Sequence, residues 1–151
     1  MIDQTRSFDI LLAEDSSADI TLVREALKQH SIQCSLHVIR DGAQVVALLD
    51  DFDKDPRAPA LDLLLLDMHL PKCGGQEILR RLRSTTHYAQ TPVVVMASVD
   101  SAGLEEPAQK CAALKYFPKP STLDEFMELG AVVRHVLLGE ASSSSANGSA
   151  E

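Results

Sequence analysis

Short runs of apolar residues alternate along the chain with longer stretches in which apolar residues recur every three or four positions. The short runs have the length and composition of buried strands, and they occupy residues 8–13, 36–39, 61–67, 92–97 and 115–117. The longer stretches have helical spacing, and helices are expected at 16–30, around 45–49 and 78–82, and from 121 to 138. A further helix is expected within 103–113, where Pro107 must make it start late or bend.

This alternation predicts an α/β fold, a doubly wound five-stranded parallel sheet with helices on both faces. The near-unbroken apolar run at 61–67 supports a strand that is buried on both faces. We expect one domain over residues 8–139, with a polar extension at 1–7 and a flexible, serine-rich tail at 140–151. In such sheets ligands bind at the carboxyl ends of the strands. The site is therefore expected at that edge.

Three acidic residues follow two of the predicted strands. Glu14 and Asp15 come directly after the first strand, and Asp67 ends the third. In the strand order 2-1-3-4-5 these two strands are neighbours, so the three carboxylates converge and repel one another unless a cation neutralises them. Carboxylate oxygens around a small open site suit Mg²⁺. Lys119 ends the fifth strand and would bring a positive charge to the same edge.

Each of these residues has a plainer explanation when it is taken alone. An acid after a strand is often only a helix cap, as Asp15 could be, and Asp67 could be a turn residue before Pro71. Lys119 could be a solvated surface lysine. The combination is harder to explain in this way, because all of these residues are expected at one edge of one sheet. We therefore favour a cation-binding site over unrelated surface residues.

The composition excludes several classes of function. The chain has 151 residues, 45% of them hydrophobic, which suits one domain with one core. Its net charge of -8 argues against nucleic-acid binding and against an anionic membrane surface. The three cysteines lack the spacing of a zinc site. We therefore expect them to be free thiols in a reducing compartment. Because no apolar leader or run of membrane-spanning length is found, we expect a soluble, cytoplasmic protein.

At the acidic residues after the strands and at Lys119, the chain resembles the receiver domains of two-component response regulators. The resemblance extends over about 8–138 and rests on the segments 11–15, 64–71, 74–75 and 119–120. It implies the flavodoxin-like three-layer sandwich of that family. The Asp41-Gly42 turn and the segments 70–72 and 119–123 resemble most the stand-alone receivers that serve phytochrome-type kinases.

The resemblance implies a role for each acidic residue. Asp67 would accept a phosphoryl group from a phosphohistidine of a sensor or hybrid histidine kinase, forming an acyl phosphate. Asp15 and Asp67 would bind Mg²⁺ directly, together with the backbone carbonyl of His69, and Glu14 would hold a metal-bound water. An aspartate is an established covalent acceptor of phosphate, and phosphoryl transfer asks mainly for positioning and charge neutralisation.

The resemblance also implies how a phosphoryl group would be detected. Lys119 would pair with the phosphate, the peptide bond before Pro120 would be cis, and Tyr116 falls on the aromatic switch position. The family usually has Thr or Ser at the end of the fourth strand, where this chain has Ala97. Ser98 could replace that hydroxyl only if the strand shifts or ends early, because successive side chains point to opposite faces. We therefore expect Asp67 to be phosphorylated and switching to be weakened or rerouted.

The resulting hypothesis is a signalling module that is not an enzyme. We expect no output domain after Gly139, so the protein would bind a downstream protein or pass phosphate on as a shuttle or sink. Homodimerisation stays open. An aspartate-nucleophile phosphatase is disfavoured, because it needs a second acid where this chain has His69. A nucleotide- or flavin-binding domain is disfavoured, because no glycine-rich loop follows the first strand.

Overall fold

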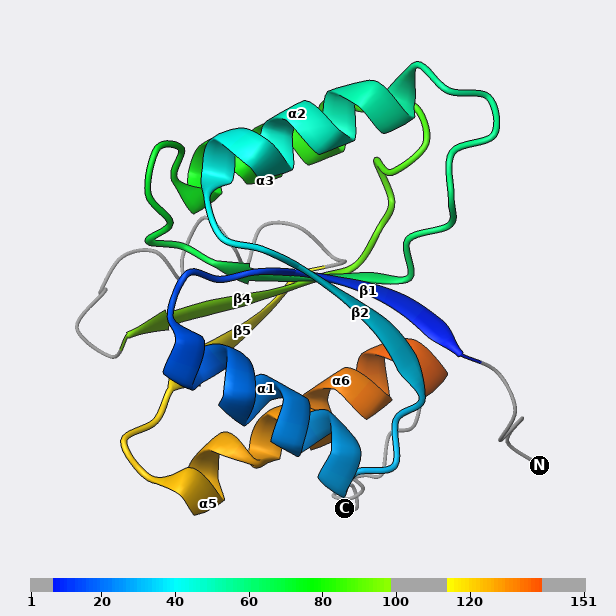
Figure 1. Ribbon diagram of the computed structural model, residues 1–151. Coiled ribbons are helices and arrows are strands. Elements are labelled where there is room, and N and C mark those ends of the chain that lie inside the picture. The colour runs from blue at the N-terminus through cyan, green and yellow to red at the C-terminus, as the bar shows by residue number, and fades with distance from the viewer. Residues whose placement is uncertain (1–6, 99–113, 140–151) are drawn as a thin grey trace, which may run out of the picture.

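The computed structural model describes residues 7–98 and 114–139. Its elements, in chain order, are β1 (Phe8–Ala13), α1 (Ser17–Gln29), β2 (Cys34–Ile39), α2 (Gly42–Asp53), β3 (Leu63–Asp67), α3 (Gly75–Ser84), β4 (Val93–Ser98), β5 (Leu114–Lys119), α5 (Leu123–Phe126) and α6 (Glu128–Leu138). The strands form one parallel sheet in the order β2-β1-β3-β4-β5 (Figure 1). The predicted fold class and strand order are confirmed.

The side chains of β3 alternate between two apolar cores. Leu63 and Leu65 belong to the core shared with α1 and α6, and Leu64 and Leu66 belong to the core shared with α2 and α3. All four leucines are fully buried. Figure 1 shows α2 and α3 on one side of the sheet and α1, α5 and α6 on the other. The predicted burial of this strand on both faces is confirmed.

Helices α1 and α2 start in loops at the carboxyl edge of the sheet. The Ser16 hydroxyl accepts the Asp19 N–H at 3.2 Å, and the Asp41 carboxylate accepts the Gln44 N–H at 2.8 Å. Both bonds satisfy backbone donors of a first helical turn, which lack partners inside the helix. The Asp41-Gly42 turn of the sequence is therefore the cap of α2.

Helix α2 runs further than its apolar spacing predicts. It continues to Asp53, four residues past the expected end near residue 49. Tertiary contacts account for the extension: the Phe52 ring packs 6.3 Å from that of Tyr88, and Asp53 Oδ1 accepts the Thr86 N–H at 2.6 Å. Contacts of this kind override local propensity.

The last helix is divided where the sequence predicts one continuous helix. Helix α5 ends at Phe126, Met127 is in a turn, and α6 starts at Glu128. Gly130 lets α6 approach α1 closely, because a side chain there would meet the Ala26 carbonyl oxygen at 2.5 Å. The helix pair is thus packed backbone against backbone, and this close approach has no signature in the local apolar spacing.

Several sequence-based expectations lie outside the described residues. They are the helix within 103–113, its Pro107, and nearly all of the predicted extension and tail at 1–7 and 140–151. The domain limits therefore stay predictions. Among the described helices, none is long and apolar enough to span a membrane.

Candidate functional site

The predicted acidic residues do converge at the carboxyl edge of the sheet. Glu14 and Asp15 follow β1, and Asp67 is the last residue of β3. Strands β1 and β3 pair in parallel, with Ala13 opposite Leu66, so Glu14 and Asp67 are the next residues along two neighbouring strands. One carboxylate oxygen from each acid lies within 4.8 Å of the others. The neighbouring strand ends therefore position this cluster.

Burial divides the cluster into a floor and an opening. Glu14 is 0% exposed and Asp67 is 5% exposed, whereas Asp15 is open to solvent. Backbone donors orient the two buried acids: the Ser16 N–H donates to Glu14 Oε2 and the His69 N–H donates to Asp67 Oδ1, both at 3.1 Å. A ligand can reach the site past Asp15.

Arg40 anchors the loop that carries these acids. Its guanidinium donates to the Asp15 carbonyl and to the Ser17 hydroxyl, each at 3.2 Å. The residue follows β2, the edge strand beside β1. Sequence analysis did not single out Arg40, and the only signal was its position directly after a predicted strand.

Lys119 is the cation that contacts the acidic residues. Its Nζ lies 2.9 Å from Glu14 Oε1 and 3.7 Å from Asp67 Oδ1, as its place at the end of β5 predicts. A third contact, at 2.7 Å to Asp19 Oδ2, was not predicted. In the sequence Asp19 looks like the second member of a capping box, but its carboxylate accepts from Lys119 and the Ser16 N–H donates to Glu14 instead.

The electrostatics of the site favour an added cation. Burial raises the pKa of Glu14 to about 7, and the charge of Asp67 adds to this, while the Lys119 contact and the Ser16 N–H act in the opposite direction. Burial lowers the pKa of Lys119, but the hydrogen bond to Asp19 and the attraction of the Glu14 and Asp67 carboxylates outweigh it, so that pKa is raised. The carboxylates thus crowd around an ammonium that stays charged.

The donor set fits a hard divalent cation. Three carboxylates meet at one point of the sheet edge, and Glu14 Oε1 is buried without a hydrogen bond of good geometry. Its contact with Lys119 is an ion pair only. Oxygen ligands of this kind suit Mg²⁺ or Mn²⁺.

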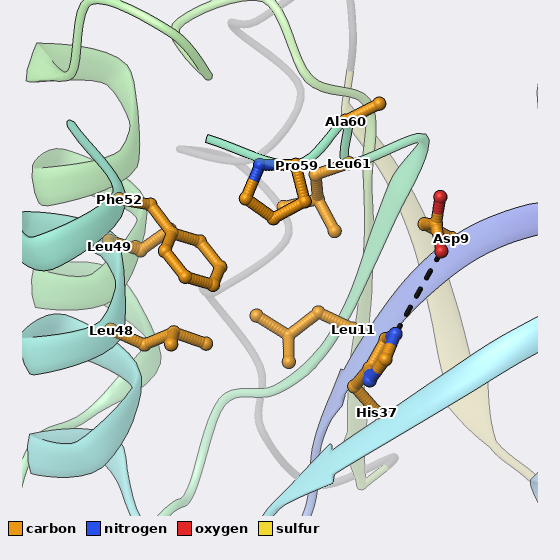
Figure 2. Close-up of a pocket in the computed structure, with 9 residues that line it drawn as sticks. All are labelled: Asp9, Leu11, His37, Leu48, Leu49, Phe52, Pro59, Ala60 and Leu61. Carbon is orange, nitrogen blue, oxygen red and sulfur yellow. Dashed lines mark ion pairs between the residues drawn. The ribbon is translucent and has the colours of Figure 1, made fainter. Parts of the chain in front are cut away.

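A separate pocket of about 340 Å³ lies between α2 and the sheet (Figure 2). Most of its lining is apolar, from Leu11 of β1 to Phe52 of α2. Asp9 and His37 supply the polar groups, with Nε2 of the histidine 3.9 Å from Oδ1 of the aspartate. The pocket shares no residue with the acidic cluster, so it is not part of the same site.

Comparison with protein families agrees with the geometry. The family model described as the response regulator receiver domain matches residues 10–130. The chain belongs to this family. The predicted resemblance is therefore confirmed, and the acidic cluster lies in a receiver domain.

Curated relatives of this receiver domain are response regulators. "Response regulator Rcp1" of Synechocystis sp. is 39% identical over 89 residues, which cover 59% of this chain and 60% of Rcp1. "Transcriptional regulatory protein CpxR" of Escherichia coli K12 is 32% identical over 141 residues, which cover 93% of this chain and 55% of CpxR. The matches thus span less than two thirds of either relative.

Solved structures place the receiver domain beside phytochrome-associated proteins. The phosphorylated cyanobacterial phytochrome response regulator RcpA superposes with a TM-score of 0.76 at 28% identity, covering 90% of this chain and 97% of RcpA. The Mn²⁺-bound form of Rcp1 gives 0.72 at 30% identity, covering 85% and 92%. The predicted likeness to stand-alone, phytochrome-associated receivers is confirmed.

The predicted switch positions of the receiver domain lie on β4 and β5. Ala97 is fully buried in the core shared with α2 and α3, and Tyr116 of β5 is half-buried and packs against that core. Strand β4 does not end early, because it continues through Ser98, which is the register partner of Lys119. One condition under which Ser98 would replace the missing hydroxyl is therefore not met.

The prediction of a cis bond before Pro120 is wrong. No peptide bond among the described residues is cis, and that range includes Lys119 and Pro120. Even before proline the trans form is favoured by about 0.5–1 kcal/mol, and with the bond trans Lys119 still reaches Glu14 and Asp19. His69 is exposed.

Proposed function

We propose that this receiver domain is a phosphoacceptor of a two-component system. Asp67 accepts a phosphoryl group from a histidine kinase in the presence of Mg²⁺, and the phosphorylated domain acts by binding another protein. The observation that carries the proposal is the convergence of Glu14, Asp15 and Asp67 around one point, with Lys119 Nζ 3.7 Å from the acceptor. These are the groups that phosphoryl transfer to a carboxylate needs.

In the proposed reaction, one Asp67 carboxylate oxygen attacks the phosphorus of a phosphohistidine. A new bond forms between this oxygen and phosphorus, and the bond between phosphorus and the imidazole nitrogen breaks. The imidazole leaves with the electron pair of that bond and then takes up a proton from solvent. Lys119 stabilises the charge on the phosphoryl oxygens, because its ammonium already lies beside the acceptor.

The metal of this proposal is Mg²⁺. Asp15 and Asp67 would hold it directly with the His69 carbonyl, and Glu14 would contact it through water. When bound, the ion neutralises charge on the acceptor and on the incoming phosphoryl group. The support is the all-oxygen donor set with one solvent-open member, Asp15. The relative Rcp1 has been crystallised with Mn²⁺, a cation that suits the same kind of ligand.

The proposed partners are proteins. A phytochrome-type sensor kinase is the proposed donor, because RcpA, whose fold this chain shares, is a phytochrome response regulator. The proposed receiver is not an enzyme in its own right and works in the cytoplasm. The proposed recipient of the signal is a downstream protein that binds the phosphorylated domain.

A second candidate function is a phosphate shuttle or sink. It is favoured by Ala97, which is fully buried and offers no hydroxyl to a phosphoryl group. In this form the domain passes the phosphoryl group to a phosphotransfer protein, or lets it hydrolyse, without a large change of shape. Transfer of the phosphoryl group from phosphorylated Asp67 to an added phosphotransfer protein would favour this candidate.

The test is phosphate-affinity electrophoresis after incubation with acetyl phosphate and Mg²⁺. A retarded band is expected for the wild type and for Asp51→Asn, which removes an exposed carboxylate of α2. No such band is expected for Asp67→Asn. Absence of a retarded band in the wild type, or its persistence in Asp67→Asn, would refute the proposed function.

A further inference from the structure

Asp19 adds a fourth carboxylate to the site, and the metal cluster does not include it. It lies in the first turn of α1, where its backbone N–H donates to the Ser16 hydroxyl. Its side chain is 24% exposed and its Oδ2 accepts from Lys119 at 2.7 Å, the shortest contact that this ammonium makes. Capping alone would leave this carboxylate at its own helix end, so the contact with β5 needs a different explanation.

The position of the ammonium is set by α1 and β1 rather than by the acceptor. A lysine ammonium has three donors; Lys119 donates to Asp19 Oδ2 at 2.7 Å and forms an ion pair with Glu14 Oε1 at 2.9 Å. Asp67 Oδ1 is 3.7 Å away, beyond that distance. A phosphoryl group on Asp67 must therefore compete with Asp19 for the same cation.

We propose that Asp19 is a positioning residue that holds Lys119 towards α1 and thereby restrains the charging of Asp67. The inference rests on the proposed phosphoacceptor function. Two physical effects act in the same direction. A carboxylate bound to the ammonium weakens its interaction with phosphoryl oxygens, and the negative charge of Asp19 repels a dianionic phosphodonor.

The same charge has the opposite effect on a divalent cation. Asp19 adds negative potential beside Glu14, Asp15 and Asp67, and so attracts Mg²⁺ before any phosphoryl group is present. Neutralising Asp19 should therefore weaken Mg²⁺ binding while it speeds phosphorylation at saturating Mg²⁺. A purely structural role at the start of α1 would not give opposite changes in these two quantities.

The test compares Asp19→Asn with the wild type. With acetyl phosphate and saturating Mg²⁺, the phosphorylation rate is expected to rise about three- to tenfold, the change given by one charge-assisted hydrogen bond that no longer competes. Mg²⁺ affinity, measured by calorimetry without phosphodonor, is expected to fall. Glu25→Gln is the matched control, because it removes one exposed negative charge from the same helix and should change neither quantity.

A second measurement isolates the contact without phosphate or metal. In Mg²⁺-free buffer, the effect of Asp19→Asn on the thermal midpoint is compared in the wild type and in Lys119→Met. The substitution is expected to be more destabilising in the presence of Lys119, by about 2–4 °C, because only there does it break the ion pair. Equal effects in the two backgrounds would overturn the inference.

The two proposals fail in different ways. If the wild type is not phosphorylated, the proposed function fails, and the restraint on charging fails with it, whatever the metal-free cycle gives. The role of Asp19 is refuted, and the phosphoacceptor function stands, if the wild type is phosphorylated but Asp19→Asn is phosphorylated no faster. The same holds if Glu25→Gln raises the phosphorylation rate as much as Asp19→Asn does.

Discussion

The acidic cluster at the carboxyl edge of the sheet and the neighbouring end of β4 are stabilised by different kinds of contact. At the edge, Lys119 lies between 2.7 and 3.7 Å from three carboxylates, and backbone donors fix Glu14 and Asp67. At the end of β4, Ala97 is fully buried among apolar side chains, and Tyr116 packs against the same core. The charged network responds to an ion, whereas the apolar core responds mainly to a change in volume.

The difference separates the acceptance of a phosphoryl group from its detection. Every side chain proposed for acceptance lies at the site: the three carboxylates have oxygens within 4.8 Å of one another, and Lys119 Nζ is 3.7 Å from Asp67 Oδ1. The proposed detection step has a methyl group where the family usually has a hydroxyl, at Ala97. A domain of this kind can be phosphorylated normally and still change its conformation little.

The largest effect is expected at the metal site. Asp15→Asn removes the exposed carboxylate of the cluster and should lower Mg²⁺ affinity by more than about tenfold, since even substitutions beyond the direct ligands cost 10–100-fold. Thermal stability without metal should change little, because this residue is open to solvent. Calorimetric titration with Mg²⁺ checks this, with Asp51→Asn as control. Unchanged affinity would remove Asp15 from the site.

The second effect is expected at the end of β4. Ala97→Thr should lower the free energy of unfolding by about 1–3 kcal/mol, because it inserts extra atoms into a fully buried position. With Mg²⁺ and the acyl-phosphate mimic beryllofluoride, the variant should gain more hydrogen-exchange protection in β5 around Tyr116 than the wild type does. The added hydroxyl would then have a phosphoryl-like group to bind.

Val95→Thr is the matched control for that substitution. It places a hydroxyl in the same core, two residues earlier in β4 and further from the carboxyl edge. It should destabilise the fold without increasing the response to beryllofluoride. An equally large response in the wild type would show that Ala97 does not limit switching.

A third effect is a pH dependence of stability. The folded-state pKa of Glu14, raised by burial to about 7 from an ordinary 4.5, means that the folded protein binds this proton more tightly than the unfolded chain. The stability gained is complete below about pH 4.5 and is lost as the pH rises through 7. The thermal midpoint of the metal-free protein should therefore fall between pH 5 and 8 through this group.

Mg²⁺ should reverse this trend, because it binds the ionised carboxylate that the proton otherwise neutralises. Stabilisation by Mg²⁺ should accordingly grow from pH 5 to pH 8. In Glu14→Gln the metal-free dependence in this window should flatten. A midpoint that falls equally steeply in that variant would assign the dependence to other groups.

Much of the fold and of the site follows from local sequence pattern. The apolar runs locate all five strands, and the unbroken run before Asp67 already indicates a strand buried on both faces. Since parallel strands end at one edge, the positions of Glu14, Asp15 and Lys119 at the ends of strands were sufficient to bring them together. These inferences depend on alternation and strand order, which local pattern encodes well.

The features that were missed depend on contacts between distant parts of the chain. Asp19 contacts a residue 100 positions away, and its local pattern indicates only a helix cap. The division of the last helix at Met127 and the close approach at Gly130 depend on packing against α1. The bond before Pro120 was expected to be cis only through the family resemblance. Its trans form in the structure is the ordinary preference of the peptide bond.

The most direct measurement is the intact mass of the protein after incubation with acetyl phosphate, with Mg²⁺ and with a chelator. The account predicts a gain of one phosphoryl group that requires Mg²⁺, maps to Asp67 and is absent in Asp67→Asn. It also predicts that Ala97→Thr gains the group to the same extent, because acceptance does not depend on the end of β4. A wild type without this gain in the presence of Mg²⁺, or an equal gain with the chelator, would contradict the account.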